Sequence, residues 1–328
     1  MGGSARLAAT ANSTLFVRLA GWINLGILAA FLVSNFLTYG AGLAGPALLG
    51  PATGPAAWFQ FALYPLAVVL ACWYVLAGRS LTLRADADRV TAINNFVIRA
   101  AFWAVLIVGV VDLAISFLRV ENLLQAIVGD QLARDLGRSH FRGFYVHVPL
   151  VMLGIVIAAF TRTLGFTWLA LLIVIAELLI VFSRFLYSYE QAFMGDLVRF
   201  WYGALFLFAS AYTLVEEGHV RVDVFYASFS SRTKGMVNAV GTLTMGLVFC
   251  WTILIIGMGG KASIINAPVF NFETSPTGSG MAIKYMMAAF LGIFAISMMI
   301  QFVAYLMSAV ADWRDEPGHV DHEAAGYA

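Results

Sequence analysis

The sequence predicts an all-α fold: a polytopic helical membrane protein with about eight transmembrane helices and both termini in the cytoplasm. Of its 328 residues, 61% are hydrophobic and only 11% are charged, and the mean hydropathy is +0.86. Average soluble domains are roughly 45–50% apolar and about 25% charged. This chain has too few charges to cover a water-facing surface, which excludes a soluble enzyme, a nucleic-acid-binding protein and a disordered protein.

Eight apolar runs are candidate transmembrane helices, each of which needs about 20 mostly apolar residues. The runs are continuously apolar, unlike the alternating pattern of a membrane β-barrel strand. The predicted spans are Leu15–Tyr39, Trp58–Ala77, Ala92–Leu118, Phe144–Phe160, Thr167–Leu186, Phe200–Val215, Met236–Gly259 and Ala282–Val310.

Two runs depart from the ideal length. Phe200–Val215 is short and aromatic, which is also compatible with a helix lying partly along the membrane interface. Ala282–Val310 is long, so it either tilts or continues beyond the membrane as an amphipathic helix. The connection Gly40–Ala57 is rich in glycine and proline, carries no charge and is predicted to be an extracytoplasmic loop.

The distribution of basic residues predicts the orientation, because cytoplasmic loops carry an excess of Lys and Arg. Basic residues precede the first run and follow the second, fourth and sixth runs: Arg6, Arg18, Arg79, Arg84, Arg89, Arg162, Arg221, Arg232 and Lys234. This pattern places both termini in the cytoplasm. The segment Arg119–Arg142 conflicts with this pattern. It carries several arginines mixed with Glu121, Asp130 and Asp135, yet it follows the third span and is therefore placed on the extracytoplasmic side. We expect this segment to contain a helix on the membrane surface.

The chain is predicted to divide near Arg162–Phe166 into two four-span regions. Residues 1–162 form an extra N-terminal membrane region, residues 163–311 form the second membrane region, and residues 312–328 form a polar cytoplasmic tail. The two halves show no convincing sequence repeat, so the pattern does not predict an inverted-repeat transporter.

Three ionisable residues lie inside predicted spans: Asp112, His147 and Glu177. Buried ionisable groups in a membrane are costly, so they form either an ion or proton site or hydrogen bonds between helices. The sequence favours hydrogen bonding. Glu177 and Arg184 are seven residues apart and share one helix face, which suits contact with another protein's helix.

Motifs of enzymatic or cofactor chemistry are missing from the sequence. Only one of the five histidines, His147, lies within a span, so a bis-histidine haem site is not expected. No HExxH, GxSxG or Walker-type sequence occurs. Cys72 and Cys250 both lie inside apolar runs, where cysteine is usually a small buried hydrophobic residue. We therefore expect no catalytic residue, metal site or cofactor in this chain.

The densest polar cluster follows directly after the sixth run. It reads Glu216-Glu217-Gly218-His219-Val220-Arg221-Val222-Asp223. Gly218 suits the left-handed end of a helix, and on these grounds alone the cluster is a solvated cytoplasmic turn. Together with the preceding Ala211-Tyr212-Thr213-Leu214, it resembles the signature of the small membrane subunit of tripartite ATP-independent periplasmic (TRAP) transporters, the DctQ family.

Weaker similarities to that family follow in the expected order. They are the arginine in Val181–Phe185, the acidic residue in Gly195–Leu197, the basic stretch Ser230–Lys234, and the polar entry to the last helix with Glu273–Pro276 and Lys284. The resemblance covers about Phe166–Val310. The sequence departs from the family in three ways: only Asp196 stands at the usual acidic pair, Ala288 and Ala289 occupy a region where proline is common, and four N-terminal spans lie outside the usual core.

The resemblance implies a subunit of a secondary transporter in the bacterial inner membrane. In such systems a periplasmic substrate-binding protein delivers an organic acid anion to a large, DctM-like membrane subunit, which imports the anion with sodium ions. The small subunit is a fixed scaffold beside that moving part. Sodium ions are therefore expected in the large partner, and the other partner of this chain is the lipid bilayer rather than nucleic acid.

The resemblance also assigns expected roles to residues. A cytoplasmic hydrogen-bonded turn is expected from Glu216, Glu217, Gly218, His219, Arg221 and Asp223, and contacts with partner proteins are expected from Glu177, Arg184, Asp196 and Lys284. The matched motifs do not cover the extra N-terminal spans, and our hypothesis is that these spans widen the scaffold. Two alternatives stay open: a stand-alone transporter or channel that uses Asp112, His147 and Glu177, and a membrane anchor for a redox or enzymatic partner. No residue reports the substrate or the sodium stoichiometry.

Overall fold

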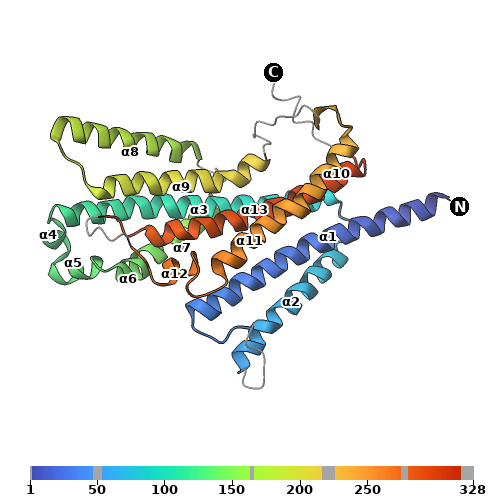
Figure 1. Cartoon of the computed structure of the whole chain (residues 1–328), viewed down its shortest axis with the longest axis horizontal. Coiled ribbons are helices and arrows are strands. Elements are labelled where there is room, and N and C mark those ends of the chain that lie inside the picture. Colours follow the sequence, from blue (N-terminus) through green and yellow to red (C-terminus); the bar gives the residue numbers. More distant parts are fainter. Residues whose placement is uncertain (1, 47–53, 163–165, 216–225, 275–279, 319–328) are drawn as a thin grey trace. The chain divides into compact units, whose positions relative to one another are not determined.

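A computed structural model of the chain describes residues 2–46, 54–162, 166–215, 226–274 and 280–318 (Figure 1). The regular secondary structure of these residues consists of helices, and the described residues contain no strand. The long helices are α1 (Gly2–Asn35), α2 (Pro55–Ala77), α3 (Leu83–Val120), α7 (Val148–Phe160), α8 (Phe166–Tyr187), α9 (Ala192–Val215), α10 (Ser231–Gly241), α11 (Leu247–Met258) and α13 (Lys284–Trp313).

Short helical segments extend or connect the long helices. Single π-helical turns continue α1, precede α7 and join α10 to α11: η1 (Phe36–Gly40), η3 (Gly143–His147) and η5 (Thr242–Gly246). The remaining short elements are α4 (Leu124–Val128), α5 (Asp130–Leu136), α6 (Ser139–Arg142), η4 (Tyr226–Ser228) and α12 (Asn266–Phe270).

The prediction of eight membrane-spanning helices is confirmed. Eight helical stretches in the described residues are long and apolar enough to cross a membrane: Thr14–Gly40, Pro55–Ala77, Leu83–Val120, Ser139–Phe160, Thr167–Tyr187, Ala192–Val215, Ser231–Met258 and Lys284–Trp313. The cytoplasmic location of the termini stays a prediction.

The third and sixth helices begin well before the residues that the apolar pattern predicts. The third begins at Leu83 rather than Ala92, and the sixth begins at Ala192 rather than Phe200. Both added segments carry charged residues whose partners come from elsewhere in the fold, which a hydropathy window does not register. The run Phe200–Val215 is thus part of a 24-residue helix. Such a helix is about 36 Å long at 1.5 Å per residue, enough to cross a bilayer.

The segment between α3 and η3 contains helices, as expected. The three short helices α4, α5 and α6 enclose a small apolar cluster in which Leu124, Ala133 and Leu136 are buried. Ile115 and Leu118 of α3 pack against the same cluster. Burial of these side chains explains why an arginine-rich segment folds compactly beside an apolar helix.

Contacts divide the chain into two compact units, each considered by itself. Unit 1 comprises residues 1–94, 213–259 and 298–328, and unit 2 comprises residues 95–212 and 260–297. Each unit therefore combines segments from before and after residue 162. The sequence division into regions 1–162, 163–311 and 312–328 stays a prediction.

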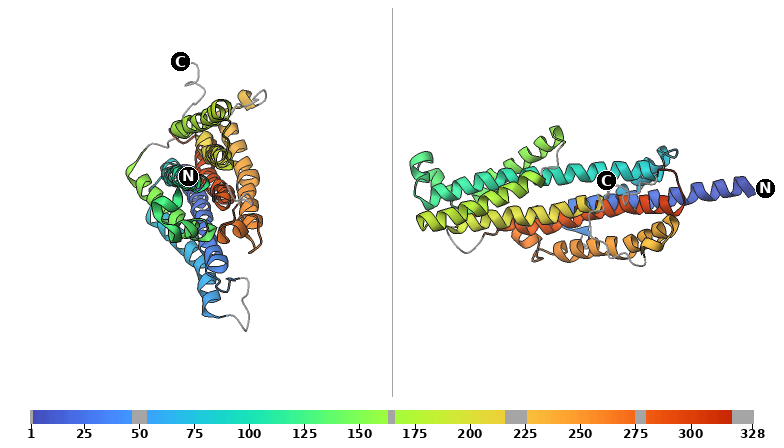
Figure 2. Two further views of the ribbon diagram at one scale, coloured as in Figure 1. Left: turned by 90° about the vertical axis from the view of Figure 1, so that its left-hand side faces the viewer. Right: turned by 90° about the horizontal axis from the view of Figure 1, so that it is seen from above.

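Unit 1 is built around the helical hairpin of α1 and α2, which lie side by side (Figures 1 and 2). A buried ion pair joins α1 to the start of α3: Arg18 Nε donates to Asp86 Oδ2 at 2.6 Å. Polar hydrogen bonds also connect α1 to α11, where Trp251 Nε1 donates to Asn24 Oδ1 at 2.9 Å. These contacts fix helices that are far apart in the sequence.

Unit 2 is packed by aromatic residues and by one close helix crossing. Phe290 of α13 contacts Phe200 and Phe208 of α9, with ring centroids 5.1 and 5.0 Å apart. Gly154 of α7 lies directly against α3, because a Cβ at this position would be only 2.6 Å from the backbone nitrogen of Ala104. A glycine lets the two backbones approach this closely, as in many membrane helix contacts.

Candidate functional site

A buried polar cluster in unit 2 brings together the two intramembrane residues Asp112 and His147. Asp112 lies on α3, and its carboxylate is fully buried, as is the imidazole of His147. His147 Nε2 is 2.9 Å from Asp112 Oδ1. Arg142 of α6, which is 1% exposed, donates from Nη1 to the same carboxylate oxygen at 3.0 Å. The cluster thus joins α3 to the segment that precedes α7.

The second oxygen of Asp112 connects this cluster to the segment that leads into α13. Asp112 Oδ2 accepts a hydrogen bond from the backbone nitrogen of Ala282 at 2.8 Å. Tyr285, in the first turn of α13, places its hydroxyl 2.8 Å from His147 Nδ1. A neutral His147 that carries its proton on Nε2 satisfies both contacts, because it donates to Asp112 and accepts from Tyr285.

Arg142 and Arg119 supply the positive charge of the cluster. Arg142 Nη1 also donates to Ser116 Oγ at 3.2 Å, and its Nε donates to the carbonyl of Leu136 at 2.8 Å. Arg119 Nη2 donates to the carbonyl of Gly280 at 3.1 Å. Breaking a buried ion pair by removing one partner costs about 3–5 kcal/mol. The cluster is therefore suited to holding helices together.

Sequence reasoning identified Asp112 and His147 but missed Arg142 and Tyr285. The arginines of the segment 119–142 carried information about sidedness only, and Tyr285 was one of many aromatic residues. The signal that points to Arg142 is the cost of an unpaired carboxylate within a membrane, which requires a nearby cation. Which arginine supplies it depends on the path of α4 to α6.

Glu177 does not join this cluster. It is exposed on α8, a helix of unit 2 whose long apolar side chains are also largely exposed. These include Trp168, Leu171, Val174, Leu178, Phe182 and Phe185. Only Leu169 and Ala176 are buried among the described α8 residues. The helix therefore presents an apolar surface with one carboxylate in its middle.

Arg184 lies near the end of α8 and shares this exposure. Its Nε is 3.6 Å from a carboxylate oxygen of Glu190, and both side chains are more than half exposed. An exposed pair of this kind contributes about 0–1 kcal/mol. Arg184 lies on the same helix as Glu177, and its side chain is accessible to another molecule.

Asp196 and Lys284 both lie at the beginning of helices in unit 2. Asp196 Oδ2 accepts from the backbone nitrogen of Met281 at 3.1 Å, which ties the start of α9 to the segment before α13. Lys284 forms an ion pair with Glu273. Both residues therefore have contacts within the chain.

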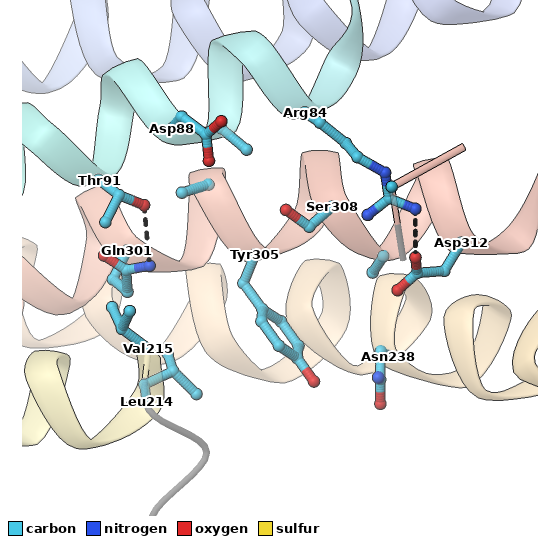
Figure 3. Close-up of a pocket in the computed structure, with 14 residues that line it drawn as sticks. Arg84, Asp88, Thr91, Leu214, Val215, Asn238, Gln301, Tyr305, Ser308 and Asp312 are labelled. Carbon is cyan, nitrogen blue, oxygen red and sulfur yellow. Dashed lines mark hydrogen bonds and ion pairs between the residues drawn. The ribbon is translucent and has the colours of Figure 1, made fainter. Parts of the chain in front are cut away.

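The polar string of Glu216, Glu217, Gly218, His219, Arg221 and Asp223 lies outside the described residues. The elements on either side of it are described: α9 ends at Val215, and Tyr226 begins η4 and exchanges hydrogen bonds with Asn238 of α10. Leu214, Val215 and Asn238 all line one pocket of unit 1 (Figure 3).

This pocket has a volume of about 360 Å³ and a polar lining from α3 and α13 (Figure 3). Two hydrogen bonds join residues of its lining across α3 and α13: Gln301 Nε2 donates to Thr91 Oγ1 at 3.3 Å, and Arg84 Nη2 donates to Asp312 Oδ1 at 2.7 Å. Asp88 and Ser308 add further hydrogen-bonding groups. The pocket can therefore accept a polar segment or ligand.

Metal-binding groups of three or more His, Cys, Asp or Glu side chains are not found in the parts of the chain that the structure describes. Cys250 is buried in α11, and burial of this kind leaves it a small hydrophobic residue.

Comparison with known families locates a match in the second half of the chain. Residues 170–314 match the family described as "Tripartite ATP-independent periplasmic transporters, DctQ component". The match covers less than half of the 328 residues and includes α9 to α13 and nearly all of α8. Comparison with curated proteins and with solved structures gives no match.

Proposed function

We propose that this chain, whose residues 170–314 match the DctQ family of TRAP transporter components, is the fixed scaffold subunit of a transporter that imports an organic acid anion with sodium ions. The family match is the observation that carries the proposal. A large DctM-like membrane subunit and a periplasmic substrate-binding protein complete the proposed complex. We place it in the bacterial inner membrane, with both termini in the cytoplasm and the sodium ions in the large subunit.

The buried cluster of unit 2 supports a scaffold rather than a transport pathway. A pathway in the membrane needs polar groups that are available to bind and release an ion. Both oxygens of Asp112 and both ring nitrogens of His147 are instead engaged by protein groups. This arrangement speaks against a stand-alone transporter that uses these two residues.

The exposed surface of α8 supports a contact with the large subunit. An exposed carboxylate such as Glu177 is costly against lipid, whereas a polar group on a partner helix can satisfy it. We propose that Glu177 and Arg184 face that partner. Asp196 and Lys284 also have partners within the chain, and we propose that they contribute to the partner contact by positioning the segments that they join.

The polar string 216–223 is proposed to form a hydrogen-bonded turn that fixes the end of α9. The polar pocket of unit 1 supports this role, because residues directly before the string line it and Asn238, a hydrogen-bond partner of Tyr226, does as well. In this proposal Arg221, His219 and the acidic residues contribute geometry rather than a ligand site.

The extra N-terminal spans are proposed to be an integral part of the scaffold. Asp112, Arg142 and His147 lie before the family-matched segment, and Ala282 and Tyr285 lie within it. The buried cluster thus links the two parts of the chain directly within unit 2.

Reconstitution into liposomes tests the proposed function. The chain is prepared with a DctM-like large subunit and a periplasmic substrate-binding protein from the same organism, and uptake of labelled organic acids is measured with an inward sodium gradient. We expect uptake only when all three proteins are present, and reduced recovery of the complex with Arg221→Ala. Uptake by this chain alone would support the stand-alone transporter instead, and normal assembly and uptake with Arg221→Ala would contradict the proposed turn.

A further inference from the structure

The buried cluster of unit 2 has more positive than negative charge. Arg119 and Arg142 each carry a positive charge, and the two guanidinium groups repel each other while Asp112 attracts both. Asp112 supplies the negative charge of the cluster, and a neutral His147 satisfies its two contacts. Arg119, which donates to the carbonyl of Gly280, therefore has no ion-pair partner of its own among the described residues, since Asp112 is paired with Arg142.

The hydrogen bonds of the cluster show the same excess of donors. Arg142 Nη2 is buried and has no hydrogen-bond partner among the described residues. Both oxygens of Asp112 are already engaged, so this carboxylate does not provide a free acceptor aimed at Nη2. A buried donor without a partner costs about 1–3 kcal/mol, more when it is charged.

Nearby carboxylates have other partners. Glu121 accepts from the hydroxyl of Tyr189 at 2.5 Å, Asp135 pairs with Arg138 at 3.2 Å, and Glu273 pairs with Lys284. The residues just before Gly280 have the sequence Ser-Pro-Thr-Gly-Ser, which contains no acidic residue. Asp196, which accepts from the backbone nitrogen of Met281, pairs with Arg199 at 3.7 Å. Among the described residues, none of these four carboxylates forms an ion pair with Arg119 or Arg142.

We propose that Arg119 and Arg142 bind a small monovalent anion of about the size of chloride. Guanidinium groups are weakly hydrated donors that form strong charge-assisted hydrogen bonds with anions. A water molecule would satisfy Arg142 Nη2 but would leave the charge unbalanced. Arg142 is 1% exposed, which favours a small anion over a large one, and Arg119 is only partly buried.

Anion-dependent thermal stability of the purified full chain tests this site. Sodium chloride replaces sodium gluconate at constant ionic strength, with sodium acetate as a third arm to distinguish a halide site from a site for any small anion. We expect a saturable rise of the melting temperature with chloride. The variant Arg119→Gln should weaken the apparent chloride affinity at least tenfold, whereas Arg138→Gln, an exposed arginine of the same segment, should respond like the unmodified chain.

Equal melting temperatures in chloride and gluconate would overturn the proposal, as would an unchanged chloride response in Arg119→Gln. Line broadening of the chloride-35 NMR signal by the unmodified chain provides a measurement that does not depend on a variant. We expect excess broadening that bromide competes away. Broadening no greater than that of a membrane protein without such a site would also refute the proposal.

Discussion

Two buried aspartates on α3 show two ways of keeping a charge inside a helical membrane protein. Asp86 in unit 1 and Asp112 in unit 2 are both fully buried. Asp86 uses one oxygen, Oδ2, for both Arg18 at 2.6 Å and Trp22 Nε1 at 3.1 Å. Asp112 uses both oxygens and reaches two side chains and a backbone amide.

The two sites differ in which buried polar atoms have no hydrogen-bond partner. At the Asp86 site the buried atoms without a hydrogen-bond partner in the described chain are Asp86 Oδ1 and Arg18 Nη2, one acceptor and one donor of opposite charge. At the Asp112 site the corresponding atom is Arg142 Nη2, a donor without a matching acceptor. The first site is a balanced pair that joins two helices, whereas the second is a positively charged junction of several elements.

The largest effect is expected from Asp112→Asn, because this change leaves Arg142 buried without its counterion. We expect a loss of about 3–5 kcal/mol in the free energy of unfolding. Chemical unfolding in detergent measures this loss, and recovery of the large subunit with the variant tests whether the N-terminal spans support assembly. The control is Asp130→Asn, which changes an exposed aspartate of α5. Equal stability of the two variants would show that the Asp112 junction does not hold the unit together.

A smaller loss of stability is expected at the pair of Arg18 and Asp86, and a second substitution should restore most of it. Asp86→Leu alone should destabilise the chain by about 3 kcal/mol, because Arg18 is left buried and unpaired. The double variant Arg18→Met with Asp86→Leu should recover most of this loss, since buried ion pairs are often replaceable by apolar side chains and the neutral, part-buried Trp22 Nε1 is the one further described donor that loses its acceptor.

The corresponding double variant of Asp112→Leu and Arg142→Met should not recover, because His147 Nε2 and the backbone nitrogen of Ala282 would both lose their acceptor. Thermodynamic cycles for the two pairs measure the contrast. Equal recovery at both sites would remove the distinction between a balanced pair and a junction.

The smallest effect on the chain itself is expected from Glu177→Leu on α8. Glu177 is exposed, so the free energy of unfolding should change by less than about 0.5 kcal/mol. Recovery of the large subunit by affinity purification should nevertheless fall several-fold, because the proposed contact is lost. Glu190→Gln, an exposed carboxylate just after α8, is the matched control. If both variants recover the large subunit normally, Glu177 does not face the partner.

Hydropathy predicted the helices well because it depends on residues that are adjacent in the chain. It failed at the beginning of α3 and α9, where Asp86 and Asp196 are helical because contacts from other segments satisfy them. The hydropathy pattern therefore left Asp86 and Asp196 outside the predicted spans, although both carboxylates accept hydrogen bonds from other segments of the fold. Asp112 and His147 were recognised because each is an ionisable residue inside an apolar run. Their partners were not recognised, because those partners lie in other segments of the chain.

The sequence by itself determined that this is a membrane protein with eight apolar helices and a segment similar to the DctQ family, since run length, charge content and motif order are local properties. Only the tertiary structure decided which polar groups meet. Asp112 and Ala282 are 170 positions apart, and His147 and Tyr285 are 138 apart. A buried charge requires a partner but does not specify where in the chain that partner lies, and here the packing of α3, α6 and α13 selects it.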